Sequence, residues 1–289
     1  MRGAIIAHSQ KRLQLPGEIS EEAFRGIKEL VCDESGIDLG SYKDGCIKRR
    51  ISVRVRVSRS RTADEYLLKL KRDDKELKKL LKALTINVTE FFRNPPTFNK
   101  VRDVVIPIIL AEKIKTDDHV FKAWSVGCSS GEEPYSIAIL LKDLLVNEYR
   151  KFSSSIVATD VDEEMLDKGC AALYDEGQLK NVEPHLKEKY FSREDDDKYR
   201  VVKSVRRVVT FKKKNLLEDN GYENQDIIFC RNILIYFSRN LQEEILLDLA
   251  RALKKGGFLV LGKAETLTAG SRKLFEAICP TERIYRKIS

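Results

Sequence analysis

Two adjacent carboxylates stand where a glycine-containing turn leads into a helix. In the stretch FKAWSVGCSSGEEPYSIAILL, residues 121–141, an apolar β-type run reaches Gly127 and Gly131, and Glu132 and Glu133 then begin an amphipathic helix. Such a turn ordinarily suits a phosphate, because a helix N-terminus offers N–H donors and a positive dipole. Carboxylates would repel a phosphate. They indicate either a cationic ligand or ordinary helix-start acids, which gain about 0.3–1 kcal/mol from the dipole.

A third acid ends the next strand candidate. Asp160 closes the stretch SSIVATD, where a carboxylate can accept hydrogen bonds from both hydroxyls of a ribose. Ligands of parallel sheets bind beyond the carboxyl ends of the strands. The turn and Asp160 together therefore predict an adenosine-containing ligand, and no G-x-x-x-x-G-K-[ST] phosphate loop is present. S-adenosylmethionine fits, because it combines adenine and ribose with a positive sulfonium.

The bulk composition narrows the function further. The chain has 289 residues, enough for two domains, with 42% apolar and 34% charged residues. The six cysteines and three histidines are scattered, so we expect no metal site, no disulfide framework and no Ser-His-Asp triad. No apolar run approaches the roughly 20 residues that span a bilayer, and no signal peptide is recognisable. A cytoplasmic location without membrane insertion is expected.

The pattern along the chain predicts two domains of different class. We expect a flexible tail at 1–19, a basic helical domain at 20–93, a linker and helix at 94–118, and an α/β domain at 119–289. Short apolar strands alternate with helices in the last part, which is typical of a largely parallel sheet. A small antiparallel subdomain is predicted at about 186–212.

Positive charge is concentrated in the predicted helical domain. Residues 43–82 contain 15 Lys and Arg against 6 Asp and Glu, a net charge of +9, whereas the whole chain carries +8. The remainder is therefore close to neutral. A concentrated basic surface suits an acidic partner, which is a nucleic acid, an anionic membrane or an acidic protein.

The stretch CIKRRISVRVRVSRSR, residues 46–61, permits two interpretations. Its alternation imitates a strand, but Ile47, Ile51 and Val55 also make a helical stripe, and the neighbouring helices favour a helix. Arg50 and Arg54 would then share one face. That face is either a solvated basic surface or a docking surface.

Six motifs, in order, give the chain a resemblance to a known family. From about residue 20 onward, the chain resembles the chemotaxis receptor glutamate methyltransferases (CheR). The matching stretches are LTINVTEFFRNP (84–95), WSVGCSSGEEPYSIAILL (124–141), IVATDVDEEMLDKGCAALY (156–174), NLLE (215–218), DIIFCRNILIYF (226–237) and LKKGGFLVLGKAETL (253–267).

The resemblance implies a fold and an activity. It implies a Rossmann-like class I methyltransferase domain with a small antiparallel β-subdomain, preceded by an all-helical domain. The cofactor would be S-adenosylmethionine, which leaves as S-adenosylhomocysteine. The substrate would be glutamate side chains on the cytoplasmic helices of chemotaxis receptors, which become γ-glutamyl methyl esters and so tune adaptation. The helical domain would dock on these acidic helices through Arg50 and Arg54.

The resemblance also implies roles for individual residues. Arg93 and Tyr236 resemble the residues beside the reacting carboxylate. Glu133 resembles a cofactor-binding acid, which leaves Glu132 as a helix-start acid. The full set of implied cofactor-binding residues is Asn87, Thr89, Arg93, Gly127, Glu133, Asp160, Asn215, Leu216, Asn232 and Ile233.

This assignment is chemically consistent with the shortage of histidines. A glutamate carboxylate, with a pKa near 4.3, is already ionised at pH 7, so displacement at a sulfonium needs no general base. The enzyme must instead align the nucleophile and the methyl donor and remove water. An arginine fork can hold the carboxylate, and a tyrosine can add one orienting hydrogen bond.

The sequence departs from part of the family at one turn, and two other functions are also compatible with it. Some members bind a receptor pentapeptide through a glycine-containing turn of the β-subdomain, but here that turn reads SREDDDKYR, 192–200, without glycine. We therefore expect the pentapeptide-independent type, acting as a monomer. The basic domain is also compatible with a nucleic-acid methyltransferase. However, no N-P-P-Y-like loop follows the fourth strand candidate, which begins the stretch DIIFCRNILIYF. The other rival is a non-catalytic adaptor that binds S-adenosylmethionine and the receptor.

Overall fold

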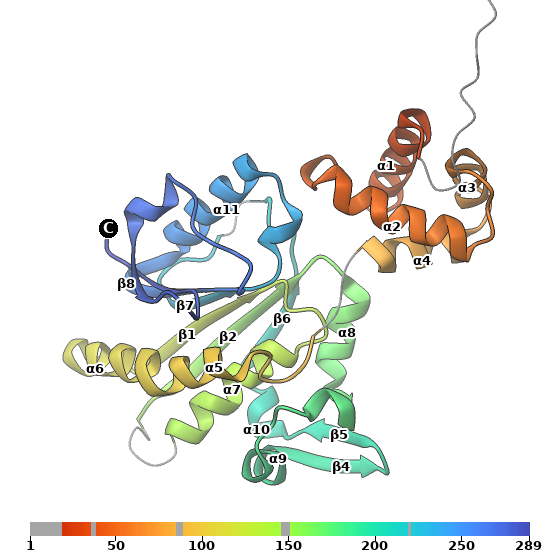
Figure 1. Ribbon diagram of the computed structural model, residues 1–289. Coiled ribbons are helices and arrows are strands. Elements are labelled where there is room, and N and C mark those ends of the chain that lie inside the picture. The colour runs from red at the N-terminus through yellow and green to blue at the C-terminus, as the bar shows by residue number, and fades with distance from the viewer. Residues whose placement is uncertain (1–18, 36–38, 85–88, 146–150, 219–220) are drawn as a thin grey trace, which may run out of the picture. The chain divides into compact units, whose positions relative to one another are not determined.

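The computed structural model describes residues 19–35, 39–84, 89–145, 151–218 and 221–289. These residues form two compact units, Met1–Ile86 and Asn87–Ser289 (Figure 1). The division lies seven residues before the expected boundary after Arg93, because the segment from Thr89 onward packs with the second unit. Most of the expected tail, 1–18, and the implied cofactor residue Asn87 lie outside the described residues.

The first unit is a small helical domain with its own core. The apolar stripes of its helices meet in a cluster that includes Ile27, Tyr66 and Leu80. Thr62 caps one helix, because its Oγ1 accepts a hydrogen bond from the Glu65 N–H at 3.1 Å. The elements are α1 (Glu21–Ser35), η1 (Leu39–Ser41), α2 (Asp44–Val57), α3 (Ala63–Leu70) and α4 (Asp74–Leu84).

Helix α2 confirms the helical interpretation of the basic stretch. Ile47, Ile51 and Val55 are all buried in the core of the first unit. A strand would place side chains with a spacing of two, whereas burial here follows a spacing of four, as one face of a helix requires. The arginines of this stretch therefore point in several directions around the helix.

Arg54 lies inside the helical unit. Its Nη2 is 2.7 Å from Glu76 Oε1, and only 16% of its side chain is exposed. The Tyr66 hydroxyl also donates a hydrogen bond to this carboxylate at 2.9 Å, and burial raises the pKa of Tyr66. Arg50 is half-buried and donates to the Leu84 carbonyl. Both arginines expected to dock a partner thus make contacts within the unit.

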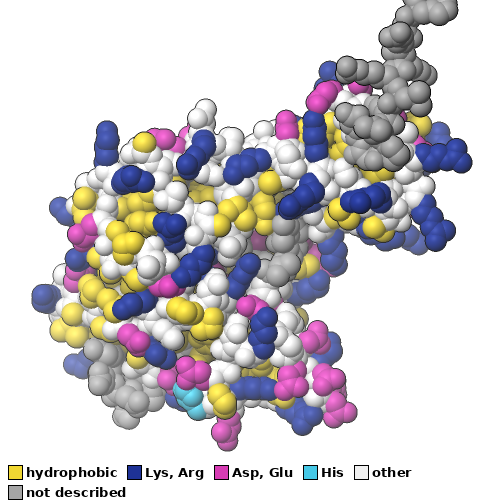
Figure 2. Space-filling model, viewed as in Figure 1, with side chains coloured by type: hydrophobic (Ala, Val, Ile, Leu, Met, Phe, Trp, Pro, Cys, Tyr) yellow, Lys and Arg dark blue, Asp and Glu magenta, His cyan; other side chains and the backbone are white. Residues whose placement is uncertain are grey.

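The exposed side of α2 carries a different set of residues. Arg49 and Arg56 are exposed, as are Val53 (45%) and Val57 (62%). Val53, Arg56 and Val57 follow Arg49 by four, seven and eight residues, which places all four residues along one face of the helix. Lys and Arg side chains are prominent on the side of the helical unit drawn in Figure 2. We call Arg49, Val53, Arg56 and Val57 the α2 surface.

The second unit is built on a seven-stranded sheet in the order β6-β2-β1-β7-β8-β10-β9 (Figure 1). The first five strands are parallel, and the last two pair in antiparallel fashion. The strands are β1 (Val120–Val126), β2 (Ser153–Asp160), β6 (Val209–Lys213), β7 (Gln225–Cys230), β8 (Leu253–Leu261), β9 (Phe275–Cys279) and β10 (Ile284–Lys287).

Helices and short helical turns connect these strands. Helix α7 is buried almost all round, since Tyr135, Ile139 and Leu140 all join the core beside the sheet. The elements are α5 (Pro95–Lys100), a π-helical turn η2 (Val101–Val105), α6 (Ile106–Thr116), α7 (Glu132–Leu145), α8 (Glu163–Ala171), α10 (Lys203–Arg206), η4 (Leu234–Tyr236), α11 (Arg239–Ala252) and η5 (Ser271–Leu274).

The antiparallel subdomain begins and ends earlier in the chain than its expected range of about 186–212. It contains β3 (Leu173–Asp175), η3 (Glu176–Leu179), α9 (Pro184–Tyr190), β4 (Phe191–Asp195) and β5 (Lys198–Val201). The strand order is β3-β5-β4, and residues 209–212 belong to the large sheet instead. The turn between β4 and β5 lies at the expected acidic residues. The sequence pattern predicts one helix that continues through Tyr174. A left-handed Ala172 instead ends α8 before that residue, and strand β3 follows.

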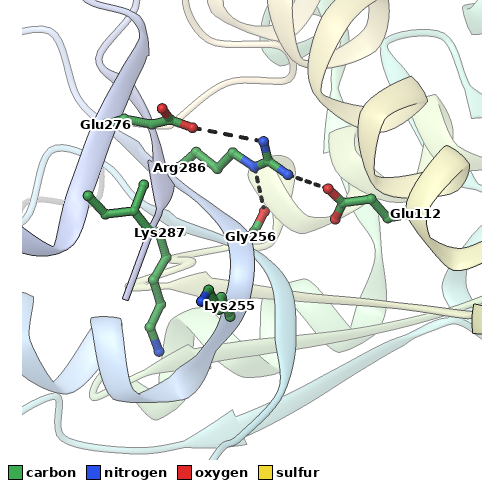
Figure 3. A pocket seen from close by; sticks show the side chains of 7 residues that line it. Glu112, Lys255, Gly256, Glu276, Arg286 and Lys287 are labelled. Atoms are coloured by element: carbon green, nitrogen blue, oxygen red, sulfur yellow. Dashed lines mark hydrogen bonds and ion pairs between the residues drawn. The ribbon is translucent and has the colours of Figure 1, made fainter.

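Ion pairs tie helix α6 to the amino ends of the strands. Asp226, at the start of β7, is fully buried and lies 2.9 Å from Lys113 of α6 and 2.5 Å from Lys254 of β8. Figure 3 shows Arg286 of β10 pointing between Glu112 of α6 and Glu276 of β9. A pocket of about 360 Å³ opens among these residues, at the start of β8. It therefore lies away from the carboxyl ends of the parallel strands.

None of the helices in the described ranges is long and apolar enough to cross a membrane. The seven-stranded sheet, the added antiparallel subdomain and the separate all-helical unit confirm the expected fold class.

Replacing Arg54 by alanine tests the buried pair. We expect Arg54→Ala to lower the free energy of unfolding of the helical unit by about 3 kcal/mol, because it leaves the Glu76 carboxylate buried without its cation. Arg49→Ala removes an exposed arginine of the same helix and should change the free energy of unfolding by less than about 0.5 kcal/mol. Chemical denaturation followed by circular dichroism measures both. Equal losses would show that the Arg54–Glu76 contact adds nothing.

Candidate active site

The strand order reverses direction between β1 and β7. The chain runs outward from β1 to β2 and β6, and then crosses back to begin β7 on the other side of β1. At such a reversal the loops after the two central strands diverge and leave a crevice, where parallel sheets bind ligands. Gly127 follows β1, Asp160 ends β2 and Asn232 follows β7. Three of the expected site residues thus meet at one edge of the sheet.

The turn after β1 requires glycine at its first position. Gly127 has a φ of +60°, and a Cβ there would lie 2.4 Å from Cδ1 of Ile233. The loop after β7 therefore packs directly on this turn. Ser129 and Gly131 also have left-handed backbone conformations, with φ of +49° and +95°. The Cys128 N–H donates to the Thr159 carbonyl at 2.9 Å, which holds the turn against the end of β2.

Asp160 keeps part of its acceptor capacity. Its Oδ2 accepts a hydrogen bond from the Ser129 N–H at 2.8 Å, and its Oδ1 accepts one from the Asp162 N–H at 2.9 Å. Burial raises the pKa of Asp160, while these two donors oppose the rise. The Val161 N–H also bonds to this carboxylate. An ionised carboxylate has about four acceptor positions, so acceptor capacity remains for a hydroxyl donor of a ligand.

Glu133 forms an ion pair with a buried arginine. Its Oε2 lies 3.1 Å from Nη1 of Arg231, whose side chain is only 2% exposed, and its Oε1 accepts from the Ser125 hydroxyl at 2.8 Å. Nη2 of Arg231 also donates to the Arg93 carbonyl at 2.8 Å and to Asn94 Oδ1 at 2.9 Å. Arg231 thus connects the end of β7, the start of α7 and the segment before α5. The reasoning from sequence did not single it out.

Glu132 is more than a helix-start acid. Its residue is fully buried, and its carboxylate accepts from the Ser130 hydroxyl at 2.9 Å and from Gln178 Nε2 at 2.5 Å. The Thr89 side chain also bonds to it, and burial raises the pKa of Glu132. An acid that only interacted with the helix dipole would not need to be buried. Glu132 therefore connects the turn after β1 with η3 and with the segment that precedes Arg93.

The segment 89–94 is held in a strained conformation. Phe92 and Asn94 have φ of +51° and +62°, which is rare for a bulky residue such as Phe92. The Phe91 N–H donates to the Gln178 carbonyl at 3.1 Å, and the Phe92 N–H donates to the Ser136 hydroxyl at 2.9 Å. Both rings are buried. Packing thus maintains a backbone that costs on the order of 1–3 kcal/mol per strained residue, and it fixes the main chain of Arg93.

The loops after β6 and β7 complete this edge of the sheet. The Lys214 N–H donates to the Asp160 carbonyl at 2.9 Å, so Asn215 and Leu216 follow directly beside the end of β2. Asn232 is left-handed, with a φ of +63°. Tyr236 ends η4 and is half-buried.

The expected cofactor residues of the second unit thus fall in two connected groups. The loops at the strand ends bring together Gly127, Glu133, Asp160, Asn215, Leu216, Asn232 and Ile233. Thr89 and the main chain of Arg93 join them through Glu132 and Arg231. The roles of these residues remain predictions. Sequence reasoning passed over Gln178, Arg231 and Glu265, although the last two lie in the quoted motifs DIIFCRNILIYF and GKAETL.

The chemistry of the site suits a cationic nucleoside. Carboxylates surround the glycine turn, Ile233 packs against Gly127, and Asp160 retains acceptor capacity. The described residues contain no cluster of His, Cys, Asp and Glu able to hold a metal ion. Burial raises the pKa of the Cys128 thiol well above its usual value, which disfavours a thiolate nucleophile. These features fit S-adenosylmethionine better than a polyphosphate.

Comparison with known proteins gives two family matches. Residues 87–284 match the family described as CheR methyltransferase, SAM binding domain, and residues 22–85 match CheR methyltransferase, all-alpha domain. The chain is 30% identical over 276 residues to a chemotaxis protein methyltransferase of Borreliella burgdorferi, covering 94% of this chain and 97% of that one. It is 33% identical over 280 residues to the chemotaxis protein methyltransferase of Klebsiella aerogenes, covering 94% and 91%.

Solved structures show a fainter likeness. The structure of PKMT2 from Rickettsia typhi in complex with AdoHcy is 15% identical, with a TM-score of 0.35. The alignment covers 61% of this chain and 26% of that one, which is too slight to bear on function.

Replacing Gly127 by alanine tests the turn. We expect Gly127→Ala to weaken binding of S-adenosylhomocysteine by about tenfold or more, because the new Cβ strains a left-handed residue and displaces Ile233. Gly45→Ala is the matched control, since a Cβ at Gly45 meets nothing within 4 Å. Isothermal titration calorimetry measures both. Unchanged affinity in Gly127→Ala would place the cofactor away from this turn.

Proposed function

Because this chain belongs to the CheR methyltransferase family, we propose that it methylates glutamate side chains on the cytoplasmic helices of chemotaxis receptors. The chain is an S-adenosylmethionine-dependent methyltransferase with a separate all-α domain. Its relatives in Borreliella burgdorferi and Klebsiella aerogenes carry the name chemotaxis protein methyltransferase. The observation that carries the proposal is the match of both family domains, in order, over nearly all of the chain. The product is a γ-glutamyl methyl ester.

Asp160 and Glu133 are the acids proposed for the cofactor. Asp160 accepts hydrogen bonds from the ribose hydroxyls through the acceptor capacity that its backbone donors leave open. Glu133 presents a carboxylate whose charge is partly balanced by Arg231. A paired carboxylate and guanidinium suit a zwitterionic amino-acid group. A carboxylate without a cation would attract only the ammonium end of that group. Asn215 and Leu216 lie by the adenine.

The reaction needs alignment rather than proton transfer. S-adenosylmethionine supplies the methyl group on a sulfonium. The receptor glutamate is ionised at neutral pH and attacks without a base. We assign Arg93 to hold this carboxylate with its guanidinium fork and Tyr236 to orient it with one hydrogen bond. The strained segment 89–94 supports the first role, since its contacts with Gln178, Ser136 and Arg231 fix the Arg93 backbone before substrate arrives.

One assay separates this proposal from its rivals. Methyl-tritiated S-adenosylmethionine is offered to a receptor signalling domain, to DNA and to RNA. We expect base-labile counts in the receptor, because a carboxyl methyl ester hydrolyses in alkali whereas an amine or ring methyl group does not. Counts in DNA or RNA would favour a nucleic-acid methyltransferase. Binding of cofactor and receptor without any transfer would favour the adaptor.

The helical unit is proposed to dock on the receptor through the α2 surface. Arg54 makes an internal ion pair and Arg50 is half-buried, so the docking role passes to Arg49 and Arg56 on the exposed side of the same helix. The exposed Val53 and Val57 add apolar area beside the two charges. A bundle of helices that carries several glutamates presents the complementary surface, in which charge guides approach and valines contact the packed helices.

Charge reversal tests this surface. We expect the double variant Arg49→Glu, Arg56→Glu to raise KM for the receptor about tenfold at low salt, because two attractive contacts become repulsive. The affinity for S-adenosylhomocysteine should not change. Lys78→Glu, Lys79→Glu makes the same charge change on exposed residues of α4 and is the control. Equal rises in KM for the two double variants would mean that net charge, rather than the α2 surface, attracts the receptor.

Three further features belong to the proposal. The enzyme acts as a monomer in the cytoplasm, where the receptor helices lie. The β-subdomain does not tether to a receptor pentapeptide, because the turn between β4 and β5 is acidic, exposed and without glycine. Neither nucleic acid nor membrane is a partner.

A further inference from the structure

We propose that Glu265 is a positioning residue of the methyl-transfer site, whose buried carboxylate fixes the loop that carries Asn232, Ile233 and Tyr236. This inference rests on the proposed function of the same site. Glu265 follows β8, four residues after the strand ends, and is only 4% exposed. It lies between the carboxyl ends of β7 and β8 and is separate from the Arg231–Glu133 pair.

Four backbone N–H groups donate to this one carboxylate. Oε2 accepts from Asn232 at 2.9 Å and from Gly262 at 2.6 Å. Oε1 accepts from Ile233 and from Leu234, both at 2.7 Å. Three of the donors are consecutive residues of the loop after β7. A left-handed residue followed by a right-handed one turns successive N–H groups toward one point and forms an anion-binding nest, and Asn232 and Ile233 have these conformations.

The partners of Glu265 favour its ionised form. All four are donors, so a carboxyl proton would have no acceptor among them. Burial raises the pKa of Glu265, while the four backbone donors oppose the rise. The carboxylate thus acts as a fixed internal anion for the nest. Without it, four buried or half-buried backbone N–H groups would need other partners, at about 1–3 kcal/mol for each group left unsatisfied.

The loop that Glu265 holds reaches the other parts of the site. Ile233 packs on the turn at Gly127. Gln242 of α11 holds the far side of η4, since its Nε2 donates to the carbonyls of Leu234 at 2.7 Å and Phe237 at 3.1 Å. Tyr236 lies within this doubly held turn. A displacement of the nest would therefore move the cofactor contacts and the tyrosine together.

Gly262 gives independent support. A Cβ at this residue would lie 2.6 Å from Glu265 Oε2 and 2.8 Å from the Asn232 nitrogen. A glycine is therefore needed for the close approach of the β8 end, the carboxylate and the nest. Its φ is not left-handed, so the requirement comes from this contact rather than from backbone conformation.

The test compares two buried carboxylates near the same edge. Glu265→Gln keeps the shape of the side chain but turns an amide NH2 toward backbone donors. Glu282→Gln is the control. Glu282 is 8% exposed and bonds to the Thr97 hydroxyl at 2.7 Å and to Lys263 at 2.6 Å, and both of these partners lie outside the loop after β7. Both variants should lose stability, so a melting temperature alone would not distinguish them.

Affinity for S-adenosylhomocysteine and kcat distinguish the two variants. At a temperature where both are folded, we expect Glu265→Gln to weaken S-adenosylhomocysteine binding about tenfold or more and to lower kcat on the receptor. Glu282→Gln should leave both unchanged. Calorimetry with S-adenosylhomocysteine needs no receptor, so this arm holds even if the receptor proves not to be the substrate. Unchanged affinity in Glu265→Gln, or equal losses in the two variants, would overturn the proposal.

A second variant, Gly262→Ala, tests the proposal if Glu265→Gln does not fold. Gly262→Ala leaves Glu265 intact but pushes its carboxylate from the Asn232 nitrogen, and the same loss of affinity is expected. If Gly262→Ala is folded and binds S-adenosylhomocysteine as the wild type does, the proposal is wrong. If neither Glu265→Gln nor Gly262→Ala folds, Glu265 serves folding alone and the proposal is likewise wrong.

Discussion

The reversal of strand order between β1 and β7 is the constraint on which the site depends. It separates the connections that leave the two central strands at their carboxyl ends, where parallel sheets bind ligands. The loops at this edge cannot pair with one another as strands do. Each needs another source of hydrogen bonds to hold it in place. The distribution of charge in the second unit follows from this need.

Carboxylates supply these bonds at three places along this edge of the sheet. Glu132 accepts from Ser130, Gln178 and Thr89, Glu133 pairs with Arg231, and Glu265 accepts from four backbone N–H groups. A buried carboxylate is costly unless it is fully hydrogen-bonded. Where it is satisfied, it fixes several loop atoms at once, as a preorganised site requires. Left-handed Phe92, Asn94, Ser129 and Asn232 lie at the same edge, so backbone strain and buried charge gather where the chemistry is proposed.

The helical unit uses its arginines in two different ways. Arg54 neutralises the buried Glu76 and stabilises the packing of α2 on α4, whereas Arg49 and Arg56 remain on the surface. The dense positive charge of residues 43–82 is therefore divided between an internal pair and an external face. Net charge alone does not reveal this division, and it predicts only that the partner of the unit is acidic.

The sequence alone determined the features that depend on neighbouring residues. An apolar run before Gly127 predicted β1, and a helical stripe made α2 a helix. The glycines of the turn and Asp160 predicted the ligand edge. Each of these signals lies in a short stretch of the chain. Residue order could not tell Glu132 from Glu133, nor Arg49 from Arg54. Those distinctions rest on partners far along the chain: Gln178 is 46 residues from Glu132, Arg231 is 98 from Glu133, and Glu265 is 33 from Asn232. Only the tertiary structure decided which charges are buried, because burial depends on which distant segments pack together.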